Sequence, residues 1–124
     1  MKKFQLCSES ASGDVIPTVT TDTFELLVLN GDGPIAVEFM SYSCEHCRAM
    51  ETILERVATM VRSKEKVFKV NIVTDRELGD HYGIQATPTL IMFLNGKKVG
   101  LVEGPRPTVS SILTAVTQPF RSMR

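Results

Sequence analysis

Residues 35–61 place two cysteines between an apolar run and an amphipathic stripe, and this order constrains the fold more than any other feature of the chain. The run at residues 35–39, "IAVEF", is nearly continuous, as expected of a strand covered on both faces. After the cysteines, apolar residues recur along one face of a helix that we expect to end near Arg62. They are Met50, Ile53, Leu54, Val57 and Val61. Cys44 and Cys47 therefore stand at a strand–helix junction.

The rest of the chain alternates between strand-like and helix-like segments. Short apolar segments predict strands at residues 15–20, 66–73 and 89–94. Amphipathic segments predict helices at residues 20–30, 75–83 and 107–120. Thr21 or Asp22 is the expected cap of the first helix, and Asn95-Gly96 predicts the turn of a hairpin with residues 97–104. This order predicts an α/β fold with parallel strands, an antiparallel edge, and a central mixed sheet of five strands flanked by four helices.

The composition indicates one soluble domain, which we place at residues 14–124 after a polar extension at residues 1–13. Fourteen basic residues balance fourteen acidic ones, so no overall field recruits nucleic acid or anionic lipid. No stretch approaches the roughly 18 apolar residues of a membrane span, and no apolar run follows the N-terminal lysines as in a signal peptide. We expect no nucleic-acid or membrane partner and a cytoplasmic location, although a trimmed exported protein would look the same.

Two cysteines at positions i and i+3 of a helix start lie close enough for a reversible disulfide. The helix N-terminus stabilises a thiolate on the outer sulfur, that of Cys44; protonated His46 adds to this effect and Glu45 opposes it. Half of a zinc site and two buried cysteines without redox chemistry remain as alternatives. A CxxC at a strand–helix junction favours disulfide exchange without a metal or another cofactor. Cys7, in the extension, is expected to be inert.

Glu38 interrupts the apolar run, where a carboxylate costs free energy unless it is paired or protonated. A buried carboxyl below the dithiol could exchange protons with Cys47 when the disulfide breaks. Lys69, in the neighbouring strand segment, could be the charge partner of this carboxyl. The alternative is a Glu38 side chain that points to solvent.

Pro88 immediately precedes a predicted strand in the stretch "QATPTLIMF". An ordinary proline at a strand entry explains this position. A cis peptide bond after Thr87, turning that backbone toward the cysteines, is the alternative.

Together these motifs resemble the thioredoxin family from about residue 17 to the C-terminus. The resemblance rests on the strand–CxxC–helix junction, the Thr-Pro pair before the fourth strand, the Asn-Gly hairpin and Gly104 after the fifth strand. Glu38 stands six residues before the first cysteine, where the family carries a buried acid. Lys69 stands where the family carries the lysine partner of that acid.

This resemblance implies the thioredoxin fold and a role for each part of the site. Cys44 would attack a substrate disulfide, Cys47 would resolve the mixed disulfide, and the bond before Pro88 would be cis. Glu38, Lys69 and His46 would assist the two cysteines. The implied substrate-binding residues are Ser43, Glu45, Ala86, Thr87, Pro88 and Gly104.

Several positions depart from the family pattern. Ser43 and Met40 replace two customary tryptophans, and Thr52 replaces a helix-kinking proline. Glu45-His46 replaces the usual Gly-Pro between the cysteines. A histidine before the second cysteine is similar to protein disulfide isomerase and to DsbA-type oxidants, and a glutamate as the buried acid also resembles the isomerases.

We therefore expect a thiol–disulfide oxidoreductase that acts as a monomeric protein disulfide reductase. Its partners would be protein disulfide substrates and a thioredoxin reductase or another dithiol electron donor. One alternative is a more oxidising oxidase or isomerase, which His46 favours. Another is a non-catalytic module that holds a partner near Pro88 and uses the cysteines as a redox-sensitive latch.

Overall fold

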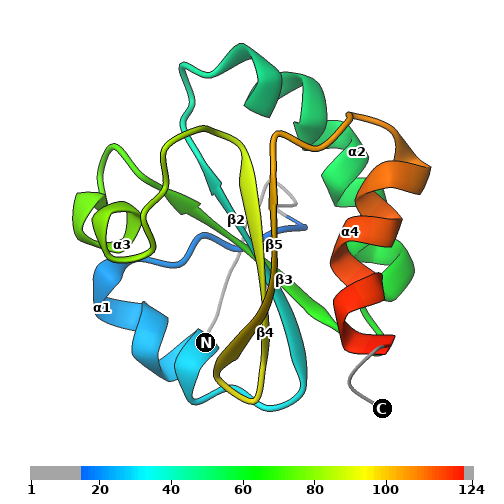
Figure 1. The fold of residues 1–124 in the computed structure, drawn as a ribbon, viewed down its shortest axis with the longest axis horizontal. Helices are drawn as coiled ribbons and strands as arrows, with labels where there is room; N and C mark the ends of the chain where they lie inside the picture. The colour runs from blue at the N-terminus through cyan, green and yellow to red at the C-terminus, as the bar shows by residue number, and fades with distance from the viewer. Residues whose placement is uncertain (1–14, 122–124) are drawn as a thin grey trace, which may run out of the picture.

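The computed structural model describes residues 15–121, which form a central sheet with helices on both faces (Figure 1). The strands are β2 (Pro34–Met40), β3 (Lys66–Asn71), β4 (Thr89–Leu94) and β5 (Lys97–Glu103). The helices are α1 (Thr21–Phe24), its π-helical continuation η1 (Glu25–Leu29), α2 (Glu45–Val61), α3 (Arg76–His81) and α4 (Val109–Arg121). The α/β class and the four helices are confirmed; Cys7 and the predicted extension at residues 1–13 lie outside the described part. None of the helices within residues 15–121 has the length and apolar character needed to cross a membrane.

The strands are ordered β3-β2-β4-β5 across the sheet. β2 runs parallel to β3 and antiparallel to β4, and β4 is antiparallel to β5. The hairpin β4–β5 therefore supplies the antiparallel side of the sheet. Asn95 and Gly96 have φ angles of 51° and 84° at its turn. Two left-handed residues match the twist of the flanking strands, which is why Asn-Gly predicts this turn correctly.

The sheet has four strands and not the predicted five. Residues 15–20 contribute a single parallel bridge, from Thr18 to Lys69 of the edge strand β3. The Pro17 carbonyl accepts a hydrogen bond from Lys69 N–H at 3.0 Å, and Val19 N–H donates to the Lys69 carbonyl at 2.8 Å. Pro17 has no N–H of its own, so the pairing does not extend into a ladder.

The cap of the first helix lies one or two residues before the predicted position. Its N-cap is Thr20 and not Thr21 or Asp22. The Thr23 hydroxyl accepts a hydrogen bond from Thr20 N–H at 2.9 Å, which stabilises this start. Thr21 instead donates its N–H to Asp75 at 2.8 Å and so ties the helix to the segment before α3.

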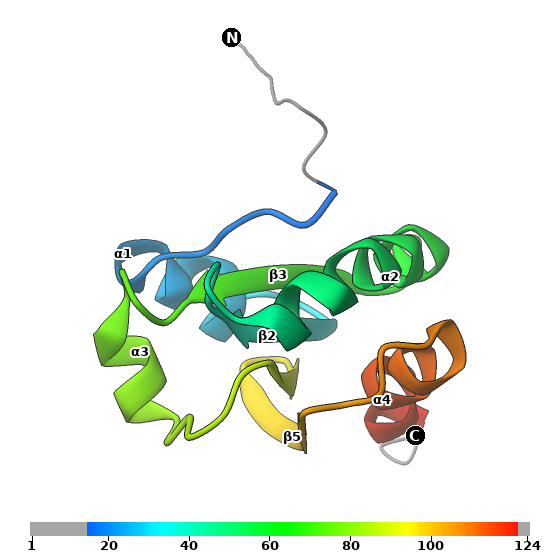
Figure 2. The same cartoon turned by 90° about the horizontal axis from the view of Figure 1, so that it is seen from above.

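Two helix layers cover opposite faces of the sheet: α2 and α4 lie on one face, and α1, η1 and α3 on the other (Figure 2). Side chains of β2 alternate between these layers. Ile35, Val37 and Phe39 belong to the core under α1 and α3, whereas Ala36 packs under α2 and α4. The same alternation directs Glu38 toward α2, where it lines a small cavity with residues of that helix.

Leu54, at the centre of the α2 stripe, is fully buried between α2, α4 and the sheet. Replacing it with alanine should lower the free energy of unfolding by about 2–5 kcal/mol. The folded state loses the transfer free energy of the removed methyl and methylene groups, and the cavity left behind destabilises it further. Urea denaturation measures the loss. Thr52→Ala, on the exposed face of the same helix, is the matched control and should stay within about 0.5 kcal/mol. A Leu54→Ala protein as stable as this control would contradict the packing described here.

Candidate active site

The two cysteines lie where β2 leads into α2, at one end of the molecule (Figure 1). Cys44 is the N-cap residue of α2, and its sulfur accepts a hydrogen bond from Cys47 N–H at 3.0 Å. Cys44 is half-buried, Cys47 is only 3% exposed, and both are free thiols. The sequence spacing therefore folds into a dithiol with an outer sulfur and an inner one.

The surroundings move the pKa values of the two thiols in opposite directions. Desolvation raises the pKa of Cys44, but hydrogen bonds outweigh it and leave that pKa lowered. These bonds come from the side chains of Cys47 and Thr87 and from the backbone N–H groups of Cys47 and His46. Burial, followed by the hydrogen bond to Cys44, raises the pKa of Cys47 to about 11. Cys44 is therefore the thiol that supplies a thiolate near neutral pH, while Cys47 keeps its proton.

The segment before β4 lies against the outer sulfur. The Thr87–Pro88 peptide bond is cis, as the resemblance implied. The Thr87 carbonyl accepts a hydrogen bond from Cys44 Sγ at 3.5 Å. Pro88 is buried, and its carbonyl accepts a hydrogen bond from Gly104 N–H at 2.8 Å. Three segments that are distant in sequence thus meet beside Cys44.

His46 connects the first turn of α2 to the loop after β5. Its Nε2 lies 3.0 Å from the Pro105 carbonyl oxygen, and because a carbonyl only accepts, Nε2–H is the donor. A Cβ atom placed on Gly104 would lie 3.8 Å from Cε1 of His46, so the imidazole also flanks this glycine. The part of His46 that lowers the pKa of Cys44 is its backbone N–H. An effect of the imidazole charge stays a prediction.

Glu38 is buried, so the solvent-facing alternative is wrong. It is 4% exposed and stands opposite Lys69, itself 7% exposed, in the parallel register of β2 and β3. Both side chains line a cavity of about 20 Å³ together with Cys47, which is room for about one water molecule. Burial raises the pKa of Glu38 to about 7; Lys69 lowers it and Glu51 raises it further. A carboxyl that exchanges protons near neutral pH therefore lies beneath the inner thiol.

The remaining predicted residues surround the dithiol on the exposed side. Glu45 is exposed in the first turn of α2, and Ala86 is exposed beside Thr87. Ser43 is also exposed, and its hydroxyl lies 2.9 Å from that of Ser41. Within residues 15–121, no group of three or more His, Cys, Asp or Glu side chains is arranged to hold a metal ion.

Sequence reasoning missed several residues of the site. Glu51 raises the pKa of Glu38, and its position four residues after Cys47 on α2 was the available signal. Tyr42 is 56% exposed beside the dithiol, with the Lys69 ammonium 5.8 Å from its ring centre. The Pro105 carbonyl is a backbone group, for which a sequence carries no signal.

Comparisons with known proteins agree with this geometry. The family model described as Thioredoxin matches residues 15–117. Thioredoxin 1 of Nostoc sp. is 37% identical over 97 residues, which are 77% of this chain and 91% of that protein. Thioredoxin of Rickettsia bellii is 40% identical over 87 residues, 67% of this chain and 83% of that protein. Thioredoxin of Griffithsia pacifica is 33% identical over 99 residues, 80% of this chain and 91% of that protein. The chain therefore belongs to the thioredoxin family, and it is a thiol–disulfide oxidoreductase whose redox pair is Cys44 and Cys47.

Proposed function

We propose that this protein reduces disulfides of protein substrates through Cys44 as nucleophile and Cys47 as resolving thiol. The observation that carries the proposal is the difference in exposure and pKa between the two thiols. The outer thiol is accessible and has a lowered pKa, whereas burial raises the pKa of the inner thiol to about 11. A thiolate attacks a disulfide whereas a thiol does not, so the outer sulfur acts first.

In the first step the Cys44 thiolate attacks one sulfur of the substrate disulfide. A bond forms between Cys44 Sγ and that sulfur, the substrate S–S bond breaks, and the other substrate sulfur leaves as a thiolate that takes a proton from water. The backbone N–H groups of His46 and Cys47, which favour the thiolate of Cys44, prepare it for this attack.

In the second step Cys47 attacks Cys44 Sγ and displaces the substrate. Its thiol must first lose a proton, and Glu38, across a cavity with room for about one water, is the acceptor we assign. The Cys44–Cys47 bond forms, the bond to the substrate breaks, and the second substrate sulfur leaves and is protonated. Two electrons thereby pass to the substrate, and the protein ends as a disulfide. Lys69 lowers the pKa of Glu38 and so favours the carboxylate form that accepts this proton.

The proposed substrate contacts are the six residues around the outer sulfur. Ser43, Glu45, Ala86 and Gly104 are exposed, which supports a surface that a substrate segment can reach. Thr87 contacts Cys44 Sγ directly through its carbonyl. A substrate segment held beside Thr87 would bring its disulfide to the attacking sulfur.

Family membership implies disulfide substrates and an electron donor of the reductase type. We propose a thioredoxin reductase or another dithiol protein as this donor, in a reducing compartment such as the cytoplasm, where a dithiol stays reduced between turnovers. We propose a monomer as the acting unit.

Turnover distinguishes this proposal from a redox-sensitive latch. Catalytic amounts of the protein should accelerate the reduction of insulin disulfides by dithiothreitol over many cycles. A protein that reacts once and then stops would contradict the proposal.

The proline and alanine variants of His46 separate the backbone from the side chain. His46→Pro removes the N–H that favours the Cys44 thiolate, so the pKa of Cys44 should rise. The reduction potential should then become more negative by some tens of millivolts, because one pKa unit on a thiol corresponds to about 1.4 kcal/mol, or about 30 mV. His46→Ala keeps the N–H and removes only the bond to Pro105, so its shift should be smaller. Equal shifts in the two variants would assign the effect to the imidazole.

A further inference from the structure

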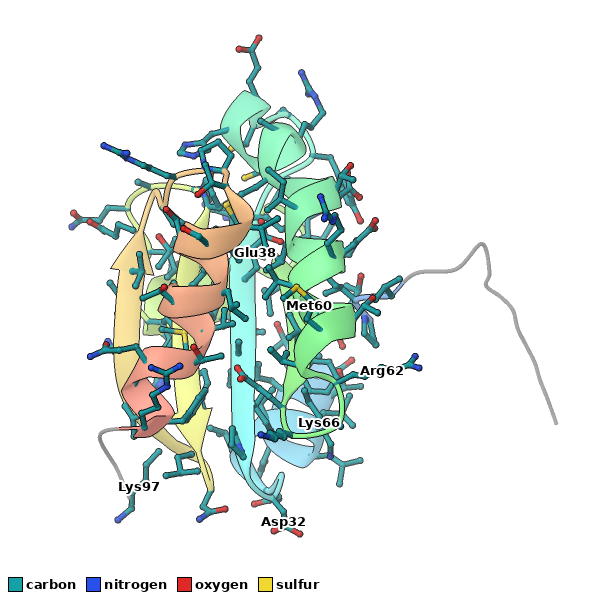
Figure 3. All side chains as sticks on the ribbon, turned by 90° about the vertical axis from the view of Figure 1, so that its right-hand side faces the viewer. Asp32, Glu38, Met60, Arg62, Lys66 and Lys97 are labelled. Carbon is teal, nitrogen blue, oxygen red and sulfur yellow. The ribbon has the colours of Figure 1, made fainter. Side chains whose placement is uncertain are left out.

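Residues 104–108, which we call the β5–α4 loop, lie beside the first turn of α2 (Figure 1). Figure 3 shows both segments at the same end of the molecule, beyond Glu38. Pro105 and Pro107 have no N–H, so this loop has few groups that can donate hydrogen bonds to its neighbours. Within residues 15–121, two hydrogen bonds join the loop to segments other than α4. These two bonds therefore have a large part in fixing the place of the loop beside the dithiol.

The two bonds hold neighbouring residues of the loop. Gly104 N–H donates to the Pro88 carbonyl at 2.8 Å, and His46 Nε2–H donates to the Pro105 carbonyl at 3.0 Å. Gly104 has a φ angle of 51°, in the region that favours glycine, so the chain turns between the two bonds. Pro105 is buried, and a buried carbonyl that loses its partner costs free energy. The imidazole of His46 is therefore one of the two attachments of this loop.

His46 reaches the attacking sulfur and the loop through different groups. Its backbone N–H favours the thiolate of Cys44, whereas its imidazole holds Pro105. The imidazole also flanks Gly104, because a Cβ atom on that glycine would lie 3.8 Å from Cε1. Gly104 is exposed and belongs to the proposed substrate surface. One residue thus connects the reacting sulfur to a wall of that surface.

We propose that the His46 imidazole is a positioning residue for protein substrates, because it holds the β5–α4 loop in place beside Cys44. This inference rests on the proposed reduction of protein disulfides. A protein segment that contacts Gly104 while its disulfide meets Cys44 needs the loop at a fixed distance from the sulfur. A small disulfide needs only the sulfur. Misplacement of a positioning group by about 1 Å can lower a rate by about 10²-fold, so the loss should be larger for the protein substrate.

Rate constants of the reduced protein with insulin and with glutathione disulfide test this role. In His46→Ala the ratio of the insulin constant to the glutathione constant should fall by about fivefold or more. His46→Gln keeps a side-chain N–H donor and should restore the ratio to within about twofold of the wild type. His81→Ala is the matched control, because it removes the chain's other imidazole, which lies on α3 against Tyr82, and it should leave the ratio unchanged.

Amide hydrogen exchange, followed by NMR on the isotope-labelled full chain, tests the loop without a substrate. In His46→Ala the Gly104 N–H should exchange about tenfold faster or more, because release of Pro105 loosens the neighbouring bond to Pro88. His46→Gln and His81→Ala should keep the wild-type exchange rate.

Three results would overturn the proposal. They are an equal loss of rate with both disulfides in His46→Ala, a wild-type exchange rate of Gly104 in that variant, and a His46→Gln protein that behaves like His46→Ala. A wild-type protein that fails to turn over insulin would instead refute the proposed function. In that case the exchange rate of Gly104 would still decide whether the imidazole holds the loop.

Discussion

Cys44→Ser should abolish disulfide reduction, whereas Cys47→Ser should leave a protein that becomes covalently attached to its substrate. Serine at position 44 removes the only sulfur with both access and a lowered pKa among the described residues, so no mixed disulfide forms. Serine at position 47 leaves the attacking thiolate in place but removes the thiol that displaces the substrate. Incubation with an oxidised protein substrate, followed by non-reducing electrophoresis, separates the two outcomes.

Alkylation of the reduced wild-type protein checks the same assignment without a substrate. Near neutral pH a thiol-specific reagent should label Cys44 first, since the pKa of Cys47 is raised to about 11 and its side chain is 3% exposed. Faster labelling of Cys47, or a stable substrate adduct on Cys44→Ser through Cys47, would reverse the roles.

Glu38→Gln should slow the second step of the reaction by about 10²-fold or more while leaving the first step nearly unchanged. A positioned general base contributes roughly 10²–10⁴ in rate. Cys47, with a pKa of about 11, needs such a base, whereas Cys44 reacts as a thiolate that already exists. An aryl disulfide with a coloured thiolate product separates the steps, because each step releases one coloured thiolate.

The pH profile of the second step distinguishes proton transfer from a merely structural role. The wild-type rate should rise as the pH passes about 7, where Glu38 becomes a carboxylate, and this limb should vanish in Glu38→Gln. Glu51→Gln is the matched control: removal of this neighbouring charge lowers the pKa of Glu38, so the limb should move to lower pH. A second step of wild-type speed in Glu38→Gln would exclude this carboxyl as the base.

The raised pKa of Glu38 also predicts that the stability of the fold decreases as the pH rises. The folded-state pKa of about 7 lies above the ordinary value of 4.5, so the folded protein binds more protons than the unfolded chain between these values. Stability contributed by the protonated group is complete below about pH 4.5 and is lost as the pH rises through about 7. The difference corresponds to roughly 3 kcal/mol. Urea denaturation between pH 5 and 8 should show this decline in the wild type, and a smaller one in Glu38→Gln.

Local periodicity predicted the parts of the fold that surround the site. The apolar run at residues 35–39 and the stripe after Cys47 define β2 and α2, because β2 is buried on both faces and the buried residues of α2 recur at helix spacing. Residues 15–20 have strand composition, yet form one bridge with the edge strand β3. Whether a segment pairs depends on the hydrogen bonds it can still donate, and Pro17 removes one.

The environment of the site depends on contacts that local sequence does not contain. The sequence does not indicate which of the two helix layers the Glu38 side chain faces. The register between β2 and β3 and the packing of β2 under α2 place this side chain beside Lys69. The imidazole of His46 meets the carbonyl of Pro105, which lies 59 residues away. One buried oxygen of Glu65 has no hydrogen-bond partner among residues 15–121, and residue type alone does not indicate this.

The reduction potential of the Cys44–Cys47 pair tests the central claim most directly. Family potentials run from about −270 mV for thioredoxin to about −120 mV for DsbA, whose reduced form is strongly stabilised. Backbone N–H groups favour the Cys44 thiolate and so make the pair more oxidising, but the imidazole of His46 hydrogen-bonds to Pro105 and gives the Cys44 sulfur no further hydrogen bond. We therefore expect a potential more negative than about −200 mV, measured by equilibration with glutathione redox buffers. A value near −120 mV would show that the pair works as an oxidant and would contradict the reductase proposed here.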